Sequence, residues 1–387
     1  MDVGGTQTEV LILCKQLKSL GHGLVIASNG GRLIREIEDL GISHYALPFN
    51  TGRKGRTVIG LFTMPYCLFR LVRIIRKERV DLVHVHAYLV PIVLGLLVSR
   101  IWKIPLVVTL NDGILYHPFK VRVLTSSGLT RTVGRMIVLT DELRRLISSG
   151  RADEEATRKC VVIPNSIDPD AYPVEMDRPD EATAEPPGTA RRVVWVGRLE
   201  TDKVGAIKAL VCSAPAILEK VPEAQLLIVG QGSRSDEVEQ LITSTNHAIG
   251  KKAIIATGFS TDVVSTLKQA YVVAGMGKVV IEAMACGKPV VIIGPVIGSS
   301  APSFGGILTL DNAKALCEYN YTGRNGTVEA TPERISEACV QLLKDEKYAR
   351  GLGCLGRQIV EAEHNIKILA KQVEDVYRDV IERKPNS

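Results

Sequence analysis

Apolar and polar residues along the first half of the chain alternate between helical and extended spacing. Residues 6–20 carry apolar side chains at helical spacing and end at Gly21, and residues 22–28 follow as a short apolar strand. The segment VDLVHVHA, residues 80–87, is almost continuously apolar, as strands of buried parallel sheets are. Further strands are predicted over residues 44–49, 106–110, 136–140 and 161–168, and further helices over 32–40 and 57–79.

The same alternation resumes after a segment of different composition. Residues 168–190 are rich in Pro, Asp and Glu and show no periodicity, which indicates a linker or an exposed loop. Beyond it, strands are predicted over residues 191–197, 224–230, 252–258 and 288–294, and helices over 207–219, 236–243, 279–287 and 361–382. Two alternations separated by a linker predict an α/β protein of two Rossmann-like domains with parallel sheets.

The chain is expected to divide into two domains and a returning helix. The N-terminal Rossmann-like domain covers residues 1–167, the linker 168–190 and the C-terminal Rossmann-like domain 191–360, while the helix of 361–387 packs back towards the N-terminal domain. The opening residues MDVGGTQ match the turn that follows the first strand of such a domain, so this strand is expected to be missing. Because ligands of parallel sheets sit beyond the carboxyl ends of the strands, the residues after each strand are the candidates for function.

Charge and composition narrow the classes of function. The net charge is +6, and residues 1–110 hold 14 Lys and Arg against 7 Asp and Glu. This basic excess leaves two interpretations open, namely contact with an anionic membrane surface or anionic acceptor, or a solvated helix face. Aromatic residues make up only 5% of the chain and no nucleic-acid-binding motif is seen, which argues against a nucleic-acid partner.

Cysteine usage and hydropathy favour a cytoplasmic protein. The eight cysteines are scattered, with no C-x-x-C pair, and are interpreted as reduced side chains. No secretory signal is evident, and the most apolar stretch, residues 88–98, is shorter than the about 20 apolar residues that a membrane span needs. We therefore expect a protein of the cytoplasm, either free or peripheral at the inner face of the membrane. No cluster of metal ligands stands out, so no metal and no other cofactor is expected.

The strongest candidate for chemistry is the segment VGRLETDK, residues 196–203. Arg198 and Lys203 lie on the loop that leaves the strand of residues 191–197. An Arg fork and a Lys point charge suit a pyrophosphate, and fixed cations stabilise the negative charge that develops on a departing diphosphate without a metal. The alternative is a pair of solvated charges near a domain boundary.

A second candidate is the glycine-rich turn within AGMGKVVIEAMACGKP, residues 274–289. Gly275 and Gly277 flank a turn that opens a helix, where free backbone N–H groups bind phosphate. Glu282 lies about one turn into this helix, where it can accept hydrogen bonds from ribose hydroxyls. The alternative for Glu282 is a carboxylate on the surface of the helix.

These motifs, in this order, resemble those of the family-4 retaining glycosyltransferases of the GT-B fold. The resemblance is carried by Gly4-Gly5-Thr6, DLVHVHA, VVIPNSID, VGRLETDK, LIVGQGS and EAMACGKPVV, which together span nearly the whole chain. It implies two Rossmann-like domains facing a cleft, with the acceptor on the N-terminal domain and the donor on the C-terminal one. It also implies the transfer of a hexose, with retention and without a metal, in the making of the cell envelope. A UDP-sugar is the favoured donor, and the acceptor is a glycan, a lipid-linked molecule or a small molecule.

The resemblance implies a role for each residue that matches the family's motifs. Arg198 and Lys203 would hold the donor phosphates and act in catalysis, and Glu282 would hold the ribose. The donor-binding residues would be Gly4, Gly5, Gly258, Gly275, Met276, Gly277, Lys278 and Glu282.

The sequence departs from the family pattern at three positions besides the missing strand. Ala274 replaces the first glutamate of the family's two-glutamate motif, so we expect sugar recognition to differ and Lys278 to take over part of the anion binding. Asn111 stands where a histidine is common, and Ser166 replaces a glycine.

Three further residues are candidates for the acceptor side or the cleft, namely His86, Asn111 and Arg324. His86 ends a predicted strand, where it can orient a substrate hydroxyl. His84 lies on the same face of this strand and is interpreted as a core histidine with satisfied hydrogen bonds.

Two other functions remain open from the sequence. A nucleotide-sugar 2-epimerase of the same fold would use carboxylates and a histidine, although no carboxylate trio stands out. A non-catalytic partner subunit of a glycosyltransferase would account for Ala274, Asn111 and the missing strand.

Overall fold

The computed structural model of the chain divides into two compact units. Unit 1 comprises Met1–Ser166 and Ile366–Ser387, and unit 2 comprises Ile167–Asn365. The structure describes residues 5–49, 56–86, 89–111, 131–149, 154–172, 174, 191–299, 301–326 and 328–383, without the side chains of residues 56–62, 89 and 149. Most of the predicted linker, residues 173 and 175–190, lies outside this part of the chain, as does Gly4. None of the described helices is long and apolar enough to cross a membrane.

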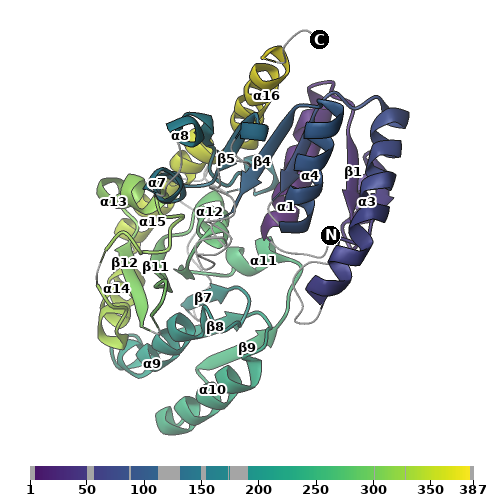
Figure 1. The fold of residues 1–387 in the computed structure, drawn as a ribbon. Coiled ribbons are helices and arrows are strands. Elements are labelled where there is room, and N and C mark those ends of the chain that lie inside the picture. Colours follow the sequence, from purple (N-terminus) through teal and green to yellow (C-terminus); the bar gives the residue numbers. More distant parts are fainter. Residues whose placement is uncertain are drawn as a thin grey trace. The chain divides into compact units, whose positions relative to one another are not determined.

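Unit 1 alternates parallel strands and helices (Figure 1), including two helices over residues 141–149 and 154–159 that the periodicity did not predict. Its elements are α1 (Gly5–Ser19), β1 (Val25–Ser28), α2 (Ile34–Asp39), β2 (Ser43–Ala46), α3 (Arg56–Glu78), β3 (Val83–His86), α4 (Leu89–Trp102), β4 (Leu106–Leu110), β5 (Arg135–Val138), α7 (Asp141–Ser149), α8 (Glu154–Lys159), β6 (Cys160–Val162) and α16 (Ile366–Glu382). The buried side chains of β4 show why its continuous apolar run predicts a strand of a parallel sheet that is covered on both faces.

The parallel strands of unit 1 form two separate sheets, β1-β2 and β3-β4-β5-β6. In a doubly wound sheet the first strand lies at the centre, between the second and fourth strands along the chain. Among the described residues no strand joins β1 to β3, and α1 is the first element. The described strands of unit 1 therefore form two sheets and not one continuous sheet.

The C-terminal helix α16 packs within unit 1. Its buried apolar side chains share one cluster with Leu13 and Leu17 of α1 and with Val107 of β4. Arg135 of β5 forms a 2.7 Å ion pair with Asp379 of α16. The helix therefore completes the core of unit 1 from the far end of the chain.

The prediction of one helix over residues 361–382 was wrong at its start. Helix α15 (Glu346–Ile359) runs into a π-helix, Val360–His364, and Asn365 then takes an extended conformation before α16 begins. Asn365 pairs with Ile167 in an isolated bridge, and the Ile167 backbone N–H donates to the His364 carbonyl over 2.8 Å. These contacts draw the backbone out of the helix where the chain passes from unit 2 to unit 1.

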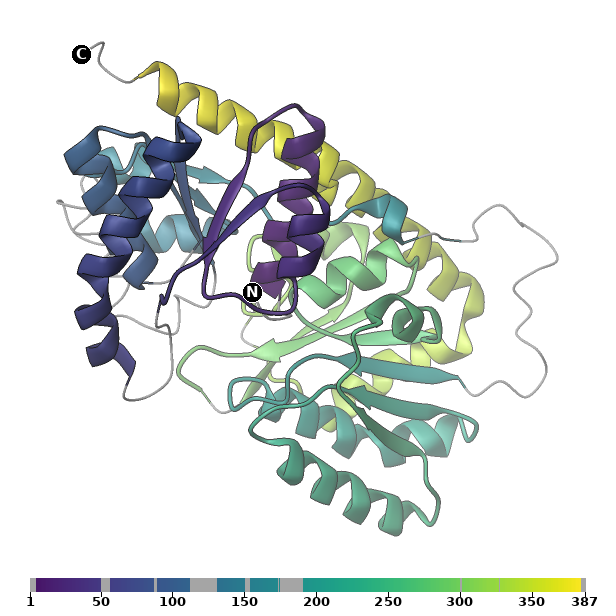
Figure 2. The same cartoon turned by 90° about the vertical axis from the view of Figure 1, so that its right-hand side faces the viewer.

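Unit 2 is one doubly wound sheet with helices on both of its faces (Figure 2). Besides the turn η2 (Pro169–Ala171), α15 and the π-helix, its elements are β7 (Arg192–Val196), α9 (Val204–Lys220), β8 (Gln225–Val229), α10 (Ser235–Ile249), β9 (Ile254–Gly258), α11 (Val263–Lys268), β10 (Val272–Gly275), α12 (Lys278–Ala285), β11 (Val290–Pro295), β12 (Pro302–Ile307), α13 (Leu310–Cys317) and α14 (Pro332–Lys344). The strand order is β12-β11-β10-β7-β8-β9, and every neighbouring pair is parallel except β11 and β12.

This order places β7 and β10 side by side, although α9, β8, α10, β9 and α11 separate them along the chain. The chain winds outward from β7 in one direction and then returns to β10 to wind in the other. Doubly wound sheets bind their ligands beyond the carboxyl ends of the strands at such a switch point. The loops after β7 and β10 are therefore the expected ligand site of unit 2.

Several elements of unit 2 were missed in the sequence. The reading of the pattern omitted β10, α11, β12, α13, α14 and α15, and it ended α10 at residue 243, whereas this helix extends to Ile249. The second half of α10 is largely polar and partly exposed, so it has no apolar stripe that would mark it. Strand β10 has only four residues and merges with the glycine turn.

Candidate functional site

Arg198 and Lys203 lie on the loop between β7 and α9, at the switch point of unit 2. Arg198 is exposed, and Lys203 is half-buried at the N-cap of α9. Within the described part of the chain, neither side chain has a hydrogen-bond or ion-pair partner. Partial burial, followed by the charge of Arg198, lowers the pKa of the Lys203 ammonium. The charges of Asp202 and Glu200 act on Lys203 in the opposite direction and raise its pKa. Two neighbouring cations at this edge of the sheet are a candidate site for a polyanion such as a diphosphate.

The loop after β8 holds this cationic loop in place. The carboxylate of Glu200 accepts hydrogen bonds from the backbone N–H of Ser233, over 3.4 Å, and from its hydroxyl. The Arg234 Nε donates to the hydroxyl of Thr201 over 3.2 Å. The segment between Arg198 and Lys203 is thus anchored at two points, which limits the motion of the two charges.

Two glycines allow the loops after β7 and β8 to approach this closely. A Cβ atom on Gly230 would lie 1.8 Å from the carbonyl oxygen of Gly197, and one on Gly232 would lie 2.3 Å from that of Leu199. Gly230 also has a φ of +153°, and its N–H donates to the carbonyl of Gly258 over 2.8 Å. The close approach of the two loops therefore explains why LIVGQGS has glycine at positions 230 and 232. The hydrogen bond from Gly230 to Gly258 links the loop after β8 to the end of β9.

The glycine turn after β10 forms the other side of the site. Gly277 is the N-cap of α12 with a φ of +67°, and no side chain caps the first turn of the helix. Its N–H lies 3.4 Å from the carbonyl oxygen of Tyr321. Gly275 ends β10, and Met276 lies between the two glycines, partly buried against the core. Because β7 and β10 are parallel neighbours, this turn and the Arg198–Lys203 loop lie at the same edge of the sheet.

Ala274 contributes only a methyl group to the core. It is fully buried inside β10, in the apolar cluster that includes Val193 and Trp195. The side chain thus points away from the solvent edge where ligands of this sheet bind. The structure therefore brings no carboxylate to this edge of the sheet from position 274.

Three charged candidates of unit 2 lie near the turn or just beyond it. Glu282 is half-buried on α12, and its charge, after burial itself, raises the pKa of the Tyr172 hydroxyl, so the two side chains are close. Lys278 and Arg324 are also half-buried, and each interacts with other groups of the chain. All three side chains therefore already have partners within the chain.

The segment before Arg324 has an uncommon backbone that the sequence analysis missed. Asn320, Tyr321 and Gly323 have φ values of +52°, +50° and +76°, all in the left-handed region. Tyr321 is 1% exposed, and its hydroxyl lies 2.8 Å from Nε2 of His364. Such conformations persist only where the surroundings hold them, and they cluster at functional sites. Here the strained turn packs against Gly277.

A second group of polar residues gathers at the carboxyl ends of the strands of unit 1. His86 ends β3, Asn111 follows β4, and the Asn111 amide donates to the hydroxyl of Thr6 over 2.7 Å. Glu9 of α1 accepts hydrogen bonds from the backbone N–H of Ser166, over 2.9 Å, and from its hydroxyl. Glu9 is a residue that the sequence analysis overlooked, although a carboxylate so near the glycine loop is itself a signal.

The two histidines of β3 have different environments. His84 is bonded on both ring nitrogens, with Tyr377 Oη at 2.6 Å and Thr109 Oγ1 at 2.7 Å, as expected of a core histidine. Burial lowers the pKa of His86 to about 4, so its imidazole is neutral at pH 7 and can exchange hydrogen bonds with a hydroxyl. Gly5 begins α1 beside this group.

Comparison with known families assigns both halves of the chain. The family described as "Glycosyltransferase Family 4" matches residues 3–171, and "Glycosyl transferases group 1" matches residues 190–345. The chain belongs to the family-4 glycosyltransferases. Its GT-B fold is the one that the motifs implied.

Two curated proteins are similar in sequence to part of this chain. One is the GDP-mannose-dependent monoacylated alpha-(1-6)-phosphatidylinositol monomannoside mannosyltransferase of Corynebacterium glutamicum, 26% identical over 182 residues, or 43% of this chain and 42% of the relative. The other is the N-acetyl-alpha-D-glucosaminyl L-malate synthase of Bacillus anthracis, 26% identical over 190 residues, or 48% and 45%. The chain thus spans less than half the length of these relatives.

Solved structures share the fold over nearly the whole chain. HepE of Anabaena in complex with UDP and glucose has a TM-score of 0.70 at 16% identity, covering 97% of this chain and 96% of its own. A glycosyltransferase of Rickettsia africae has a TM-score of 0.67 at 18% identity, covering 100% and 98%. A UDP-N-acetylglucosamine 2-epimerase of Listeria monocytogenes, itself assigned provisionally, reaches 0.62 at 14% identity, covering 98% and 95%. The GT-B fold alone therefore does not separate transfer from epimerisation.

Proposed function

We propose that this family-4 glycosyltransferase moves a hexose from a nucleotide-sugar to a hydroxyl acceptor, with retention and without a metal. The observation that carries the proposal is the pair of cations, Arg198 and Lys203, at the switch point of unit 2, beside the uncapped start of α12. Sugar transfer leaves a nucleoside diphosphate, and these groups suit its charge.

Each part of the donor has a matching group on unit 2. Arg198 can fork onto phosphate oxygens, and Lys203 supplies a point charge as the glycosidic bond to the diphosphate breaks. The first turn of α12, which no side chain caps, adds a further anion-binding element. We propose that Glu282 holds the ribose and that Gly258 lies near the base. We also propose that a phosphate oxygen of the leaving group takes the acceptor's proton on the same face of the sugar.

For the donor we favour a UDP-sugar, and we keep a GDP-sugar as the alternative because one relative is named for GDP-mannose. For the acceptor we propose a glycan, a lipid-linked molecule or a small molecule of the cell envelope, held by the polar edge of unit 1. His86 and Asn111 would orient its hydroxyl. The reaction would take place in the cytoplasm, where nucleotide-sugars are made.

Thermal unfolding in the presence of UDP, GDP, ADP and their sugar conjugates tests the donor assignment. A ligand at about 100 times its Kd adds about 2.7 kcal/mol of stability, so one base is expected to raise the Tm by several degrees and the others much less. Incubation of that donor with candidate acceptors, followed by NMR of the product anomer, then tests transfer and retention. Conversion of the sugar without any acceptor would instead indicate an epimerase, and binding without turnover a non-catalytic subunit.

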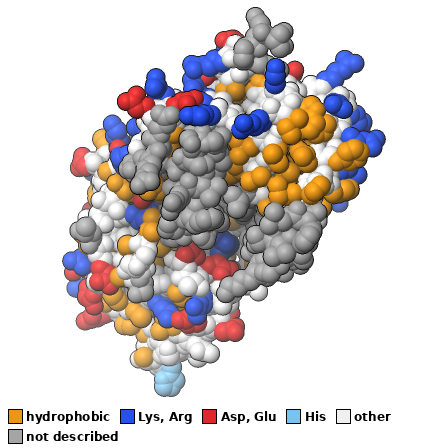
Figure 3. Space-filling view, in the orientation of Figure 1, with side chains coloured by type: hydrophobic (Ala, Val, Ile, Leu, Met, Phe, Trp, Pro, Cys, Tyr) orange, Lys and Arg blue, Asp and Glu red, His pale blue; other side chains and the backbone are white. Residues whose placement is uncertain are grey.

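We also propose that α3 and α4 of unit 1 touch an anionic membrane surface. Four apolar side chains of these helices are exposed: Tyr66 50%, Phe69 59%, Leu97 36% and Ile101 57%. Figure 3 shows hydrophobic side chains gathered over these helices, with Lys and Arg at their border. The Arg73 guanidinium lies 5.6 Å from the ring centroid of Phe69, so charge and apolar surface are adjacent. This combination suits anionic lipid headgroups above an acyl boundary.

Vesicle co-sedimentation tests the membrane contact. Replacing Arg73, Arg76 and Lys77 with glutamine is expected to weaken binding to anionic vesicles about 100-fold, because each cation near such a surface contributes about 1 kcal/mol. Neutralising three exposed lysines of unit 2, Lys314, Lys344 and Lys347, removes the same charge and should leave binding nearly unchanged. Equal loss in both triple variants would indicate an effect of net charge alone, and no loss in the first would refute the contact.

A further inference from the structure

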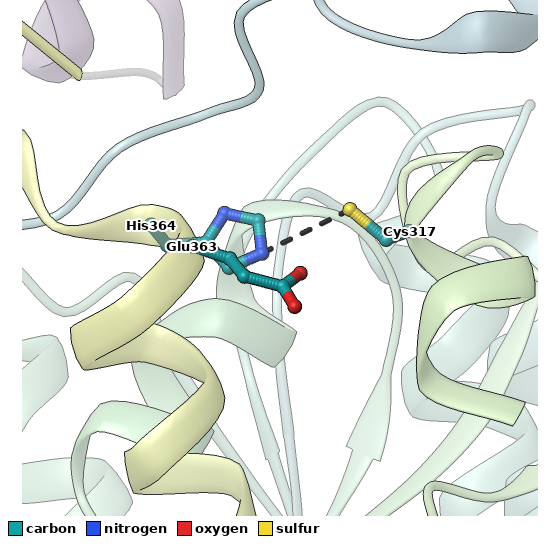
Figure 4. Close-up of side chains that lie close together, drawn as sticks. All are labelled: Cys317, Glu363 and His364. Carbon is teal, nitrogen blue, oxygen red and sulfur yellow. Dashed lines mark hydrogen bonds between the residues drawn. The ribbon is translucent and has the colours of Figure 1, made fainter. Parts of the chain in front are cut away.

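Three potential metal ligands converge at the point where the chain leaves unit 2. Cys317 ends α13, and Glu363 and His364 belong to the π-helix Val360–His364. The Cys317 Sγ lies 3.9 Å from Nε2 of His364, and the sulfur, the imidazole nitrogen and a Glu363 carboxylate oxygen all lie within 4.8 Å of one another. Figure 4 shows the three side chains pointing toward a common space from two separate elements.

The surroundings of this cluster fit a built site. His364 is 1% exposed, Cys317 is half-buried and Glu363 is exposed, so the site has a buried base and an open side for entry. The Tyr321 hydroxyl, 2.8 Å from the same Nε2, brings a further oxygen to the group. Short π-helical segments are rare and occur frequently at functional sites. The π-helix also presents two consecutive side chains, Glu363 and His364, to Cys317.

We propose that Cys317, Glu363 and His364 bind a divalent cation of the zinc type. Sulfur and imidazole ligands with one carboxylate select zinc over magnesium or calcium, which take oxygen ligands. Bonds of about 2.0–2.3 Å to zinc set tetrahedral ligand atoms about 3.3–3.7 Å apart, so the 3.9 Å between Sγ and Nε2 needs a shift of only a few tenths of an ångström. The Tyr321 hydroxyl or a water completes the shell.

Occupancy of this site would stiffen the segment that leads from unit 2 to unit 1. The His364 carbonyl accepts a hydrogen bond from the N–H of Ile167 over 2.8 Å, and Asn365 pairs with Ile167 in an isolated bridge. The two points where the chain passes between the units therefore lie beside the site. An ion held by Cys317 would tie α13 to these crossings. The role is structural or regulatory and separate from the metal-independent transfer chemistry, which uses the edge of the sheet.

Zinc binding to the untagged full chain tests the proposal. Equilibrium dialysis is expected to find one bound zinc per chain, and cobalt in its place should show the near-ultraviolet charge-transfer absorption of a thiolate ligand. Glu363→Gln, at an exposed position that does not threaten folding, and Cys317→Ser should each weaken binding at least about tenfold, since even outer-shell partners contribute that much. Hydrogen exchange of residues 360–366 should slow with zinc in the parent chain only.

Cys212→Ser and Cys354→Ser are the matched controls, because both thiols are exposed and lie outside the cluster. Both variants should keep the bound zinc and the cobalt absorption. The proposal is overturned if the parent chain binds no stoichiometric zinc, or if zinc binds equally well after Cys317→Ser and Glu363→Gln. In either case Tyr321, His364 and Cys317 are a hydrogen-bonded group of the core and nothing more.

Discussion

Replacing Arg198 with alanine is expected to lower kcat for sugar transfer about 100- to 1,000-fold, the usual cost of removing one preorganised charge-stabilising group. The side chain is exposed and makes no hydrogen bond or ion pair with any residue that the structure describes, so its loss should leave the unfolding temperature unchanged. A chain that folds normally, yet binds the nucleotide weakly and turns over slowly, is the expected result. Turnover within about threefold of the parent would show that the donor phosphates bind elsewhere.

Lys203→Ala tests the same site, and we expect it to lower activity without lowering the stability of the chain. Burial and the charge of Arg198 lower the pKa of its ammonium by more than the carboxylates of Asp202 and Glu200 raise it, so the charged form is not favoured in the unliganded chain. The variant should therefore lose activity by a similar factor while its stability stays equal or rises. Lys208→Ala is the matched control, since this lysine lies on the same helix in an exposed pair with Glu237. That pair contributes little, and the control should retain activity and stability.

Gly230→Ala is expected to unfold or severely weaken unit 2, by more than about 4 kcal/mol. The added Cβ would lie 1.8 Å from the Gly197 carbonyl oxygen, which is backbone and cannot rotate away, and the φ of +153° adds strain. Any folded fraction should bind nucleotide poorly, because the loop that carries Arg198 would be displaced. Urea unfolding of the purified variant, or its absence from the soluble fraction, measures the effect.

Gly250→Ala is the control that measures backbone strain alone, without the steric clash that Gly230→Ala adds. Gly250 has a φ of +75°, also unfavourable for alanine, but a Cβ there meets nothing within 4 Å. Its cost should stay near 1–2 kcal/mol, roughly the penalty of one left-handed residue. If Gly230→Ala proved no worse than Gly250→Ala, the close packing of the loops after β7 and β8 would not be required for stability.

Local pattern was enough to predict most strands of both units and to single out the two motifs of the candidate donor site. Strands such as β4 and β7 are buried on both faces, so they appear in the sequence as continuous apolar runs. The glycine turn before α12 is equally local, because its conformation requires residues without a Cβ. These signals are short-range, and each can be found without knowledge of the rest of the chain.

Other features depend on contacts between distant residues. The hydrogen bonds that Ser233 donates to Glu200 and that Ser166 donates to Glu9 join segments far apart in the chain, and no local pattern in the sequence predicts them. The same is true of the cluster of Cys317 with His364, and of the break at Asn365, where pairing with Ile167 overrides a helical pattern.

The sequence by itself determined the class of the fold, the alternation of its elements and the cations and glycines of the candidate donor site. Only the tertiary structure decided that β10 pairs with β7, which brings residues far apart in the chain to one edge of the sheet. It also decided that Ala274 faces the core and that burial and the charge of Arg198 lower the pKa of Lys203. The physical reason is that apolar periodicity specifies which face of an element is buried, whereas the choice of partner depends on the packing of the whole unit.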